Sequence, residues 1–289
     1  MELVHDRDGH GPWELPLLRS ELIAAPFVHG FTTRAGGVSA PPFDTLNLGA
    51  KWGDAPARVS ENRRRLERAV GGAILVARQV HGTVIARVRP GDDPGALAQV
   101  EADGLCSDAP GLALGVFVAD CIPAVLVDPR TGSFAAVHAG WRGTVAGVLP
   151  AAVRTLRTEF GARPGDLRVA LGPAIGPCCF EVGPEVVAAF EALVPDARAR
   201  GIVLPSPRGA AGKANVDLKA ANRLLLERAG VAPAAIDAGP ECTHCDRARF
   251  FSFRRDGSGI GQLMGVVGRA DAHLTSAAPT PSDVGRGGP

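Results

Sequence analysis

The sequence lacks several features that would assign it to common classes of protein. Its 289 residues include no tyrosine. No uninterrupted apolar run reaches the ~18 residues of a membrane-spanning helix. The polar residues 1–12 also lack the charged-then-apolar pattern of a signal peptide. We therefore expect a cytoplasmic protein that has no membrane segment.

Neither sign of charge is in excess. The 31 basic and 30 acidic residues give a formal net charge of +1, and no window is dominated by one sign. Proteins that bind nucleic acids through electrostatic attraction carry a basic face, so a nucleic-acid partner is not expected. Six cysteines in a chain of this length, without a signal peptide, also argue against a disulfide scaffold.

Several catalytic motifs are missing as well. No histidine is followed two residues later by glutamate, so the zinc-deaminase signature is absent. The sequence contains neither a Gly-x-Ser-x-Gly elbow nor a P-loop. Its seven histidines are scattered and include no His-x-His pair, which excludes a multi-metal cluster built on imidazoles.

The sequence does contain alternating strand-length apolar runs and segments with helical spacing. We expect strands at 73–80, 83–89, 112–118, 122–127 and 133–137, helices at 56–70, 184–193 and 217–229, and a closing hairpin formed by 250–254 and 262–267. A further helix is expected from Thr144, its N-cap, with a kink or split at Pro150. This pattern predicts an α/β protein in which residues 1–274 form one domain. Residues 275–289 have the composition of a disordered tail.

Three apolar runs end beside a residue that could bind a metal or attack a substrate. The strings are Val80-His81-Gly82, Asp120-Cys121-Ile122-Pro123 and Val137-His138-Ala139-Gly140. Functional side chains gather at strand ends, because the strand fixes them and the loop exposes them. One thiolate and two imidazoles suit zinc with an open fourth position. Two other interpretations stay open: a buried cysteine with two hydrogen-bonded histidines, or a metal-free Cys–His nucleophile pair.

Two glycine-containing turns carry an arginine. His138-Ala-Gly-Trp-Arg142-Gly-Thr leads from a strand into a helix, whose first N–H groups favour an anion. Arg142 at that position would suit a phosphate or a carboxylate, although a surface arginine in a simple turn is the alternative. Thr33-Arg34-Ala-Gly-Gly-Val-Ser is a second such turn, without a clear strand–helix context.

The remaining cysteines predict no second metal site. Cys242-Thr-His-Cys245 resembles half of a structural zinc site. Cys178 and Cys179 are adjacent and are not spaced as a ligand pair, so they are interpreted as small apolar residues buried in a loop.

Taken together, the motifs closely resemble the YfiH-type laccase-domain family, also called multicopper polyphenol oxidase-like or peptidoglycan editing factor. The resemblance extends over about residues 26–268. It is carried by Thr32-Thr-Arg34-Ala-Gly-Gly-Val-Ser, Leu46-Asn47-Leu-Gly, Gln79-Val-His81-Gly, Glu101-Ala-Asp103-Gly, Ala119-Asp-Cys121-Ile-Pro, Ala136-Val-His138-Ala-Gly-Trp-Arg142-Gly-Thr, Leu171-Gly-Pro-Ala-Ile-Gly-Pro, Phe180-Glu-Val-Gly and Phe250-Phe-Ser-Phe-Arg254-Arg-Asp-Gly.

The resemblance implies a fold, a cofactor and an activity. The fold is a four-layer α/β/β/α sandwich with mixed sheets, similar to a bacterial toxin domain with a Cys–His hydrolase site. The cofactor is one zinc ion with an open coordination position, at the positions His81, Cys121 and His138. The activity is purine nucleoside phosphorylase toward adenosine, inosine, guanosine and 5′-methylthioadenosine, together with adenosine deaminase. The expected partners are therefore a nucleoside and phosphate, with Arg142, Arg34 and Asn47 as candidate binding residues.

Two alternative functions use the same residues. One is a metal-independent hydrolase of peptidoglycan-precursor peptides, with Cys121 as nucleophile and His138 as base. The other is a copper-dependent polyphenol oxidase, but a four-copper laccase needs about ten histidines, largely in His-x-His pairs. With seven histidines and no His-x-His pair, the chain supports one metal ion at most, and copper is less favoured than zinc. Phe253 stands where the family usually has tyrosine, and the Cys242–Cys245 string varies in the family. The sequence predicts no oligomeric state.

Overall fold

The computed structural model describes residues 2–5, 15–207, 209 and 212–270. The tail predicted at 275–289 lies outside the described residues, and the single domain over 1–274 stays a prediction. Among the described residues, no helix combines the length and apolar character needed to cross a bilayer.

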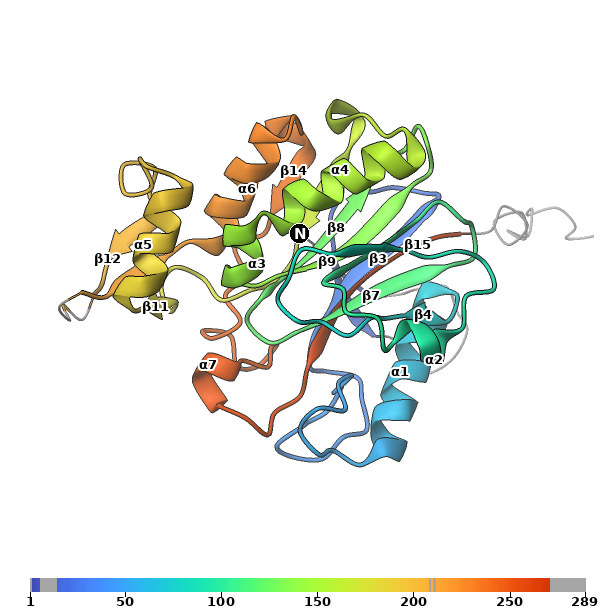
Figure 1. Cartoon of the computed structure of the whole chain (residues 1–289). Coiled ribbons are helices and arrows are strands. Elements are labelled where there is room, and N and C mark those ends of the chain that lie inside the picture. Colours follow the sequence, from blue (N-terminus) through green and yellow to red (C-terminus); the bar gives the residue numbers. More distant parts are fainter. Residues whose placement is uncertain (1, 6–14, 208, 210–211, 271–289) are drawn as a thin grey trace, which may run out of the picture.

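Within the part of the chain that the structure describes, two six-stranded mixed sheets and one small sheet form the framework (Figure 1). The first sheet has the order β1 (Glu2–His5), β2 (Pro16–Arg19), β3 (Phe27–Thr32), β15 (Leu263–Arg269), β7 (Ala113–Val118), β4 (Ile74–Leu75). The second has the order β14 (Ile236–Ala238), β10 (Arg168–Leu171), β8 (Ile122–Val127), β9 (Phe134–Ala139), β6 (Gly104–Ser107), β5 (Ile85–Arg87). The small antiparallel sheet contains β11 (Glu181–Val182), β13 (Ala214–Val216) and β12 (Val203–Pro205).

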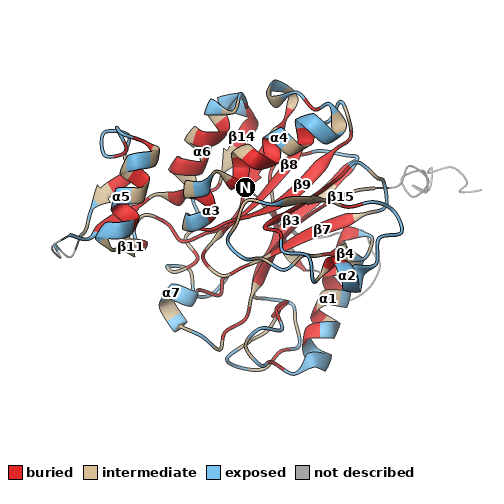
Figure 2. Cartoon of the chain, in the orientation of Figure 1, coloured by how far each residue is buried: buried red, intermediate tan, exposed pale blue. Residues whose placement is uncertain are grey.

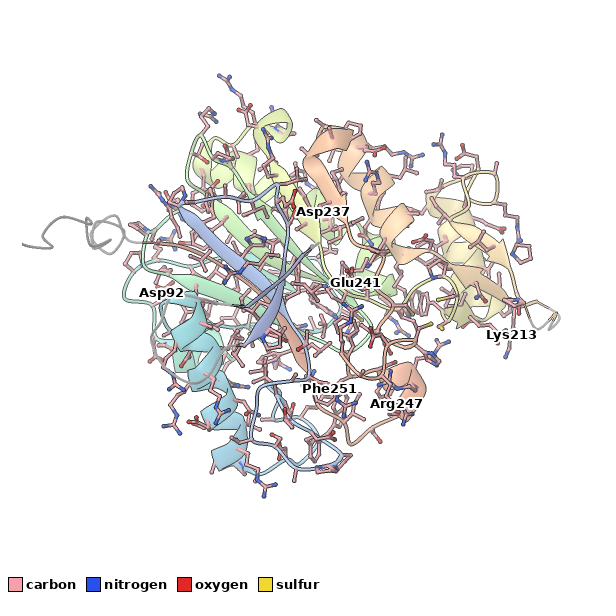
Figure 3. All side chains as sticks on the ribbon, turned by 180° about the vertical axis from the view of Figure 1, so that it is seen from behind. Asp92, Lys213, Asp237, Glu241, Arg247 and Phe251 are labelled. Carbon is pink, nitrogen blue, oxygen red and sulfur yellow. The ribbon has the colours of Figure 1, made fainter. Side chains whose placement is uncertain are left out.

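The helices are distributed over the outer faces and the connecting loops. They are α1 (Pro56–Val70), α2 (Pro94–Leu97), α3 (Trp141–Ala146), α4 (Val148–Phe160), α5 (Pro184–Leu193), α6 (Leu218–Arg228) and α7 (Phe253–Asp256), with short 3-10 turns at Pro164–Asp166 and Pro233–Ala235. Seen from behind, the lobe that carries Lys213 lies on the opposite side of the molecule from Asp92 (Figure 3).

Side-chain alternation along the strands builds the layers. On β8, Ile122, Ala124 and Leu126 pack in the core that includes helices α4 and α6, whereas Val125 and Val127 pack in the core between the two large sheets. Helix α1 covers the opposite face of the first sheet and contributes its own buried residues to a third core. Buried residues therefore occupy the strands of both sheets and the inner helix faces (Figure 2). This arrangement confirms the α/β/β/α sandwich.

Several elements match the predicted bounds, and their local signals explain why. Helix α1 begins at Pro56, whose missing N–H costs nothing in a first turn, and ends at Gly71, which has the left-handed φ of 81°. Helix α5 and strand β8 also have the predicted bounds. Asp217 caps α6 by accepting a hydrogen bond from the Ala220 N–H.

The helix expected from Thr144 is different in the structure. The split falls at Gly147 (φ 83°), between α3 and α4, and not at Pro150. Pro150 lies in the first turn of α4, where its missing N–H leaves no hydrogen bond unmade. Thr144 is buried within α3 and accepts a hydrogen bond from Asn222, so the predicted N-cap role is wrong.

The predicted closing hairpin is wrong in its first strand and in its pairing, although the strand expected at 262–267 is present as β15. Residues Phe253–Asp256 form helix α7, which Ser252 caps by accepting a hydrogen bond from the Arg255 N–H. Strand β15 instead pairs with β3 on one side and β7 on the other, at the middle of the first sheet. The run predicted at 73–80 contributes only the two-residue strand β4, and Val80 is exposed.

Candidate metal centre and adjoining pocket

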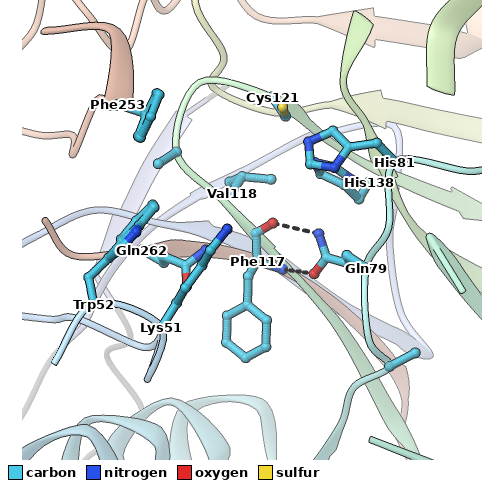
Figure 4. A pocket seen from close by; sticks show the side chains of 12 residues that line it. Lys51, Trp52, Gln79, His81, Phe117, Val118, Cys121, His138, Phe253 and Gln262 are labelled. Carbon is cyan, nitrogen blue, oxygen red and sulfur yellow. Dashed lines mark hydrogen bonds between the residues drawn. The ribbon is translucent and has the colours of Figure 1, made fainter. Parts of the chain in front are cut away.

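The fold brings His81, Cys121 and His138 together from three separate segments. His81 lies in the loop before β5, Cys121 in the turn between β7 and β8, and His138 within β9. One imidazole nitrogen from each histidine and the cysteine Sγ all lie within 4.8 Å of one another. The two rings meet edge to face, with centroids 4.8 Å apart at 87° (Figure 4).

Asp103 organises this group from behind. Its carboxylate accepts hydrogen bonds from the backbone N–H groups of Val80 (3.1 Å), His81 (2.9 Å) and Gly82 (2.6 Å), and contacts Nδ1 of His138 at 2.8 Å. Burial raises the pKa of Asp103, but the hydrogen bonds from His138 and Gly82 outweigh it and lower that pKa overall. The carboxylate fixes Nδ1 as the donor and leaves Nε2 free for a ligand. Sequence reasoning gave Asp103 no role.

One candidate ligand and the residue before another adopt left-handed backbone conformations. His81 has φ of 62° and Asp120 has φ of 90°, a region that costs energy for residues other than glycine. Asp120 is held by the Thr243 hydroxyl and by the Arg254 N–H, both at 2.6 Å from its carboxylate. The turn that presents Cys121 is therefore anchored by a segment far along the chain.

Cys121 and His138 each change the pKa of the other. Burial raises the pKa of the Cys121 thiol. The adjacent His138 and His81 lower it by more than burial raises it, so the pKa falls to about 6. Burial lowers the pKa of His138, whereas Cys121 and Asp103 raise it to about 9. Without a metal, the two groups therefore form a thiolate–imidazolium pair near neutral pH.

The residues present fit a zinc ion. Two imidazoles and a thiolate are ligands that zinc prefers, and three protein ligands leave a fourth position open. Gly140 keeps the space clear: a Cβ there would lie 2.9 Å from Sγ of Cys121 and 3.0 Å from Cδ2 of His81.

A pocket of about 380 Å³ adjoins the trio (Figure 4). Trp52 and Phe253 form one wall, with their rings stacked at 5.9 Å and 19°, and the Lys51 Nζ lies 5.3 Å from the Trp52 ring. The Gln79 side chain is fixed by two 2.8 Å hydrogen bonds to the backbone of Phe117. The other lining residues are Ala77, His81, Val118, Ala119, Cys121, His138 and Gln262. Sequence reasoning missed Lys51 and Trp52, which lie in a loop without regular spacing.

Arg142 follows Gly140 closely in sequence but does not line the pocket. It is exposed, and its guanidinium lies 4.3 Å from the ring of Trp141. Helix α3 begins at Trp141 with Gly140 as its N-cap, so Arg142 lies within the first turn.

Arg34 and Asn47 also lie outside the residues that line the pocket. Arg34 forms an ion pair with Asp44 at 3.0 Å and stacks on the Phe251 ring at 4.7 Å. The buried Asn47 accepts hydrogen bonds from the N–H groups of Gly49 (3.0 Å) and Gln262 (2.9 Å). Asn47 therefore joins the loop that precedes Lys51 and Trp52 to Gln262, whereas Arg34 joins its own loop to Arg247 and Phe251.

Four of the other five cysteines differ from the sequence interpretation. Cys178 is exposed, Cys179 is half-buried, and their thiols lie within 4.8 Å of those of Cys242 and Cys245. The interpretation as small apolar residues buried in a loop is therefore wrong. The two segments meet because Ala174 forms a parallel β-bridge with Cys242, a long-range pairing that residue spacing cannot reveal.

Comparisons with known proteins agree with this fold and these motifs. The family model described as multi-copper polyphenol oxidoreductase laccase matches residues 28–270. A Deinococcus radiodurans protein named purine nucleoside phosphorylase is 40% identical over 260 residues, covering 88% of this chain and 93% of its own. The purine nucleoside phosphorylase YlmD of Geobacillus stearothermophilus is 38% identical over 259 residues, covering 86% and 93%.

A solved structure extends the similarity to three dimensions. The crystal structure of Bacillus licheniformis hypothetical protein YfiH superimposes with a TM-score of 0.78 at 33% identity, covering 84% of this chain and 92% of that one. The resemblance found in the motifs is thus confirmed over nearly the whole described chain. The chain belongs to the YfiH-type, multi-copper polyphenol oxidoreductase laccase family.

Proposed function

We propose that the chain is a zinc-dependent purine nucleoside phosphorylase. Its substrates would be adenosine, inosine, guanosine and 5′-methylthioadenosine, and the same centre would deaminate adenosine. The main observation in favour is that a His–Cys–His ligand set opens onto an aromatic-walled pocket of about 380 Å³. That volume is within the range of ~300–1,000 Å³ of small-molecule sites. The relatives named purine nucleoside phosphorylase give independent support.

His81, Cys121 and His138 would hold the zinc ion. When bound, zinc supplies a Lewis acid beside the pocket. Asp103 keeps the His138 ring in the tautomer whose Nε2 faces the ligand set, and positions the His81 backbone at the same time. Gly140 prevents a side chain from filling the site.

The pocket offers groups for both halves of a nucleoside–phosphate pair. The rings of Trp52 and Phe253 would contact a purine face, because bases stack on aromatic side chains. Among the described residues that line the pocket, Lys51 carries the positively charged side chain of a lysine or arginine. We propose it as a phosphate contact. Arg142 would be a second contact only after leaving Trp141, and Arg34 and Asn47 would act by positioning the pocket loops.

The chemistry balances without a redox partner. In phosphorolysis, a phosphate oxygen forms a bond to C1′ of the ribose while the bond from C1′ to the purine nitrogen breaks. The base leaves with a proton, and ribose 1-phosphate remains. In deamination, water replaces the 6-amino group of adenosine and ammonia leaves.

A metal-free hydrolase is the second candidate. The lowered pKa of Cys121, about 6, favours it because a thiolate is a nucleophile near neutral pH. In that case Cys121 would attack a peptide carbonyl, the C–N bond would break as His138 gives a proton to the leaving amine, and water would then release the acid from the thioester. A multicopper oxidase is not proposed, because neither group of metal-binding side chains among the described residues contains more than two histidines.

The decisive experiment measures metal content and product formation together. Protein purified without added metal is analysed for zinc and copper. Free adenine, inosine and hypoxanthine are then measured from adenosine with and without phosphate. Phosphorolysis predicts adenine that depends on phosphate and activity that a chelator abolishes. Full activity after metal removal, with a covalent adduct on Cys121, would favour the hydrolase. Oxygen uptake with a phenol and bound copper would favour the oxidase.

A further inference from the structure

A second group of metal-binding side chains lies outside the pocket. The Sγ atoms of Cys178, Cys179, Cys242 and Cys245 all lie within 4.8 Å of one another. The distance is 3.6 Å from Cys178 to Cys245 and 3.3 Å from Cys179 to Cys245. A tetrahedral zinc site with Zn–S bonds of ~2.3 Å requires sulfur atoms about 3.8 Å apart. The sulfur–sulfur distances are thus close to those of four thiolates that bind one zinc ion.

The backbone around the cysteines is already organised for such a site. The Gly176 N–H donates a hydrogen bond to Sγ of Cys242 at 3.2 Å, as amides do around metal-bound thiolates. A Cβ at Gly176 would lie 3.2 Å from Cβ of Cys242 and 3.3 Å from Sγ of Cys178, so a larger residue would crowd the sulfur atoms. The segment between Glu241 and Arg247, both labelled in Figure 3, carries two of the four cysteines.

We propose that Cys178, Cys179, Cys242 and Cys245 bind a second zinc ion, which is structural. Four protein ligands close the coordination sphere, as in structural zinc sites, and four sulfur atoms around one position favour zinc over oxygen-preferring ions. The proposal does not depend on the function of the first site.

The second ion would act on the first site through the backbone. Thr243 lies between Cys242 and Cys245, and its hydroxyl donates to Asp120, the residue before Cys121, at 2.6 Å. The Thr243 N–H in turn donates to the carbonyl of Ala174 at 3.0 Å. Fixing the cysteine loops would therefore fix the turn that presents Cys121.

Metal analysis of the full chain tests the proposal. The Cys121→Ser variant removes a ligand of the first site, so we expect one zinc per chain to remain, held by the four cysteines. The double variant Cys121→Ser/Cys245→Ser should lose that ion as well. Cys106→Ala is the matched control, because Cys106 is buried in β6 and belongs to neither ligand set, and it should retain the full zinc content.

Cobalt substitution gives a readout that does not depend on activity. Cobalt bound to the Cys121→Ser variant should show the intense thiolate-to-metal absorption and the tetrahedral d–d bands of a four-sulfur site. This measurement decides the question even where Cys245→Ser does not fold. A Cys121→Ser protein without zinc and without these bands would overturn the proposal. So would intact-mass data that show a disulfide among the four cysteines in protein kept free of oxidants.

Discussion

Asp103 contacts His138 twice, through its side chain and through its backbone. The carboxylate lies 2.8 Å from Nδ1 of the imidazole, and the Asp103 carbonyl accepts the His138 N–H at 2.7 Å. The same carboxylate also fixes the backbone of the loop that carries His81. One buried residue therefore sets the relative positions of two ligands that come from different segments.

The first prediction follows from this contact. Asp103→Asn keeps the size of the side chain but removes its charge, so we expect zinc affinity at the first site to fall about 10- to 100-fold. Competition with a chromophoric chelator measures the change. Glu101→Gln is the control, because Glu101 lies on the same loop and pairs with the exposed Arg78. An Asp103→Asn protein with unchanged affinity would show that the ligands are positioned by other contacts.

The second prediction concerns Gly140. In Gly140→Ala, the new methyl group must displace Cys121 or His81, and we expect zinc at the first site to be lost. Overpacking of this kind costs about 1–3 kcal/mol of stability, so the chain should still fold. Gly165→Ala is the control, since nothing lies within 4 Å of a Cβ at that position. Metal content and thermal unfolding measure the two effects separately; retention of both zinc and activity would contradict the prediction.

The third prediction concerns the ionisation of Cys121 in metal-free protein. Its pKa is lowered from 9.0 to about 6, so alkylation should reach half its maximal rate near pH 6. His138→Ala removes the adjacent positive charge and should move the midpoint back toward the value of an ordinary thiol. Peptide-resolved mass spectrometry distinguishes Cys121 from the other cysteines. A midpoint that His138→Ala leaves in place would mean that the imidazole does not stabilise the thiolate.

These pKa shifts leave the stability of the metal-free chain nearly independent of pH between about 6.5 and 9. The lowered pKa of Cys121 adds stability that is lost as the pH falls through about 6, and the raised pKa of His138 adds stability that is lost as the pH rises through about 9. Between the two values, the folded pair holds one proton on His138, and above about pH 6.5 the unfolded pair also holds one, on the thiol. As the pH rises through this range, the contribution of Cys121 to stability grows while that of His138 declines, so their sum changes little. The pH dependence should therefore appear in the reactivity of Cys121 and not in the free energy of unfolding.

The fourth prediction tests the aromatic wall. Phe253→Ala removes the ring that stacks on Trp52, and we expect the nucleoside KM to rise about 5- to 150-fold, the equivalent of the ~1–3 kcal/mol of one base stack. Phe253→Tyr keeps the ring and should leave the KM nearly unchanged. Steady-state kinetics at saturating phosphate measure both variants. Equal KM values for Phe253→Ala and Phe253→Tyr would place the base elsewhere.

The fifth prediction compares two cations as phosphate contacts. Loss of a charge-assisted contact costs ~1.5–3 kcal/mol, so Lys51→Gln should raise the phosphate KM about 10- to 150-fold. Deamination, which uses no phosphate, should change much less. Arg142→Ala is measured in parallel, and a larger effect there would assign phosphate to the sequence-predicted arginine. If neither variant changes the phosphate KM, phosphate is bound without either side chain.

Local signals in the sequence predicted part of the structure. Helix α1 was predictable because Pro56 begins it and Gly71 ends it. The ligands His81, Cys121 and His138 were predictable as candidates because each follows or ends an apolar run. A strand was also predictable close to β15, but its pairing and helix α7 were not, because the partners of β15 lie far away in sequence and a short cap at Ser252 overrides the hairpin pattern.

Most of what completes the two sites depends on long-range contacts. Asp103 lies 35 residues before His138, and Gln79 is fixed by a backbone 38 residues away. The cysteine pairs meet across 66 or 67 residues. No periodicity or spacing rule encodes such distances, so these partners become visible only when the sheets are assembled.

The central place of β15 in the first sheet has a consequence for synthesis of the protein. This strand, near the end of the described chain, joins β3 to β7, and a nascent chain that lacks it has two separate sheet fragments with open edges. Gln262, which lines the pocket, arrives with the same segment. The first sheet and the pocket are therefore complete only after residues 262–269 have been synthesised, and a shorter N-terminal fragment should expose the facing edges of β3 and β7.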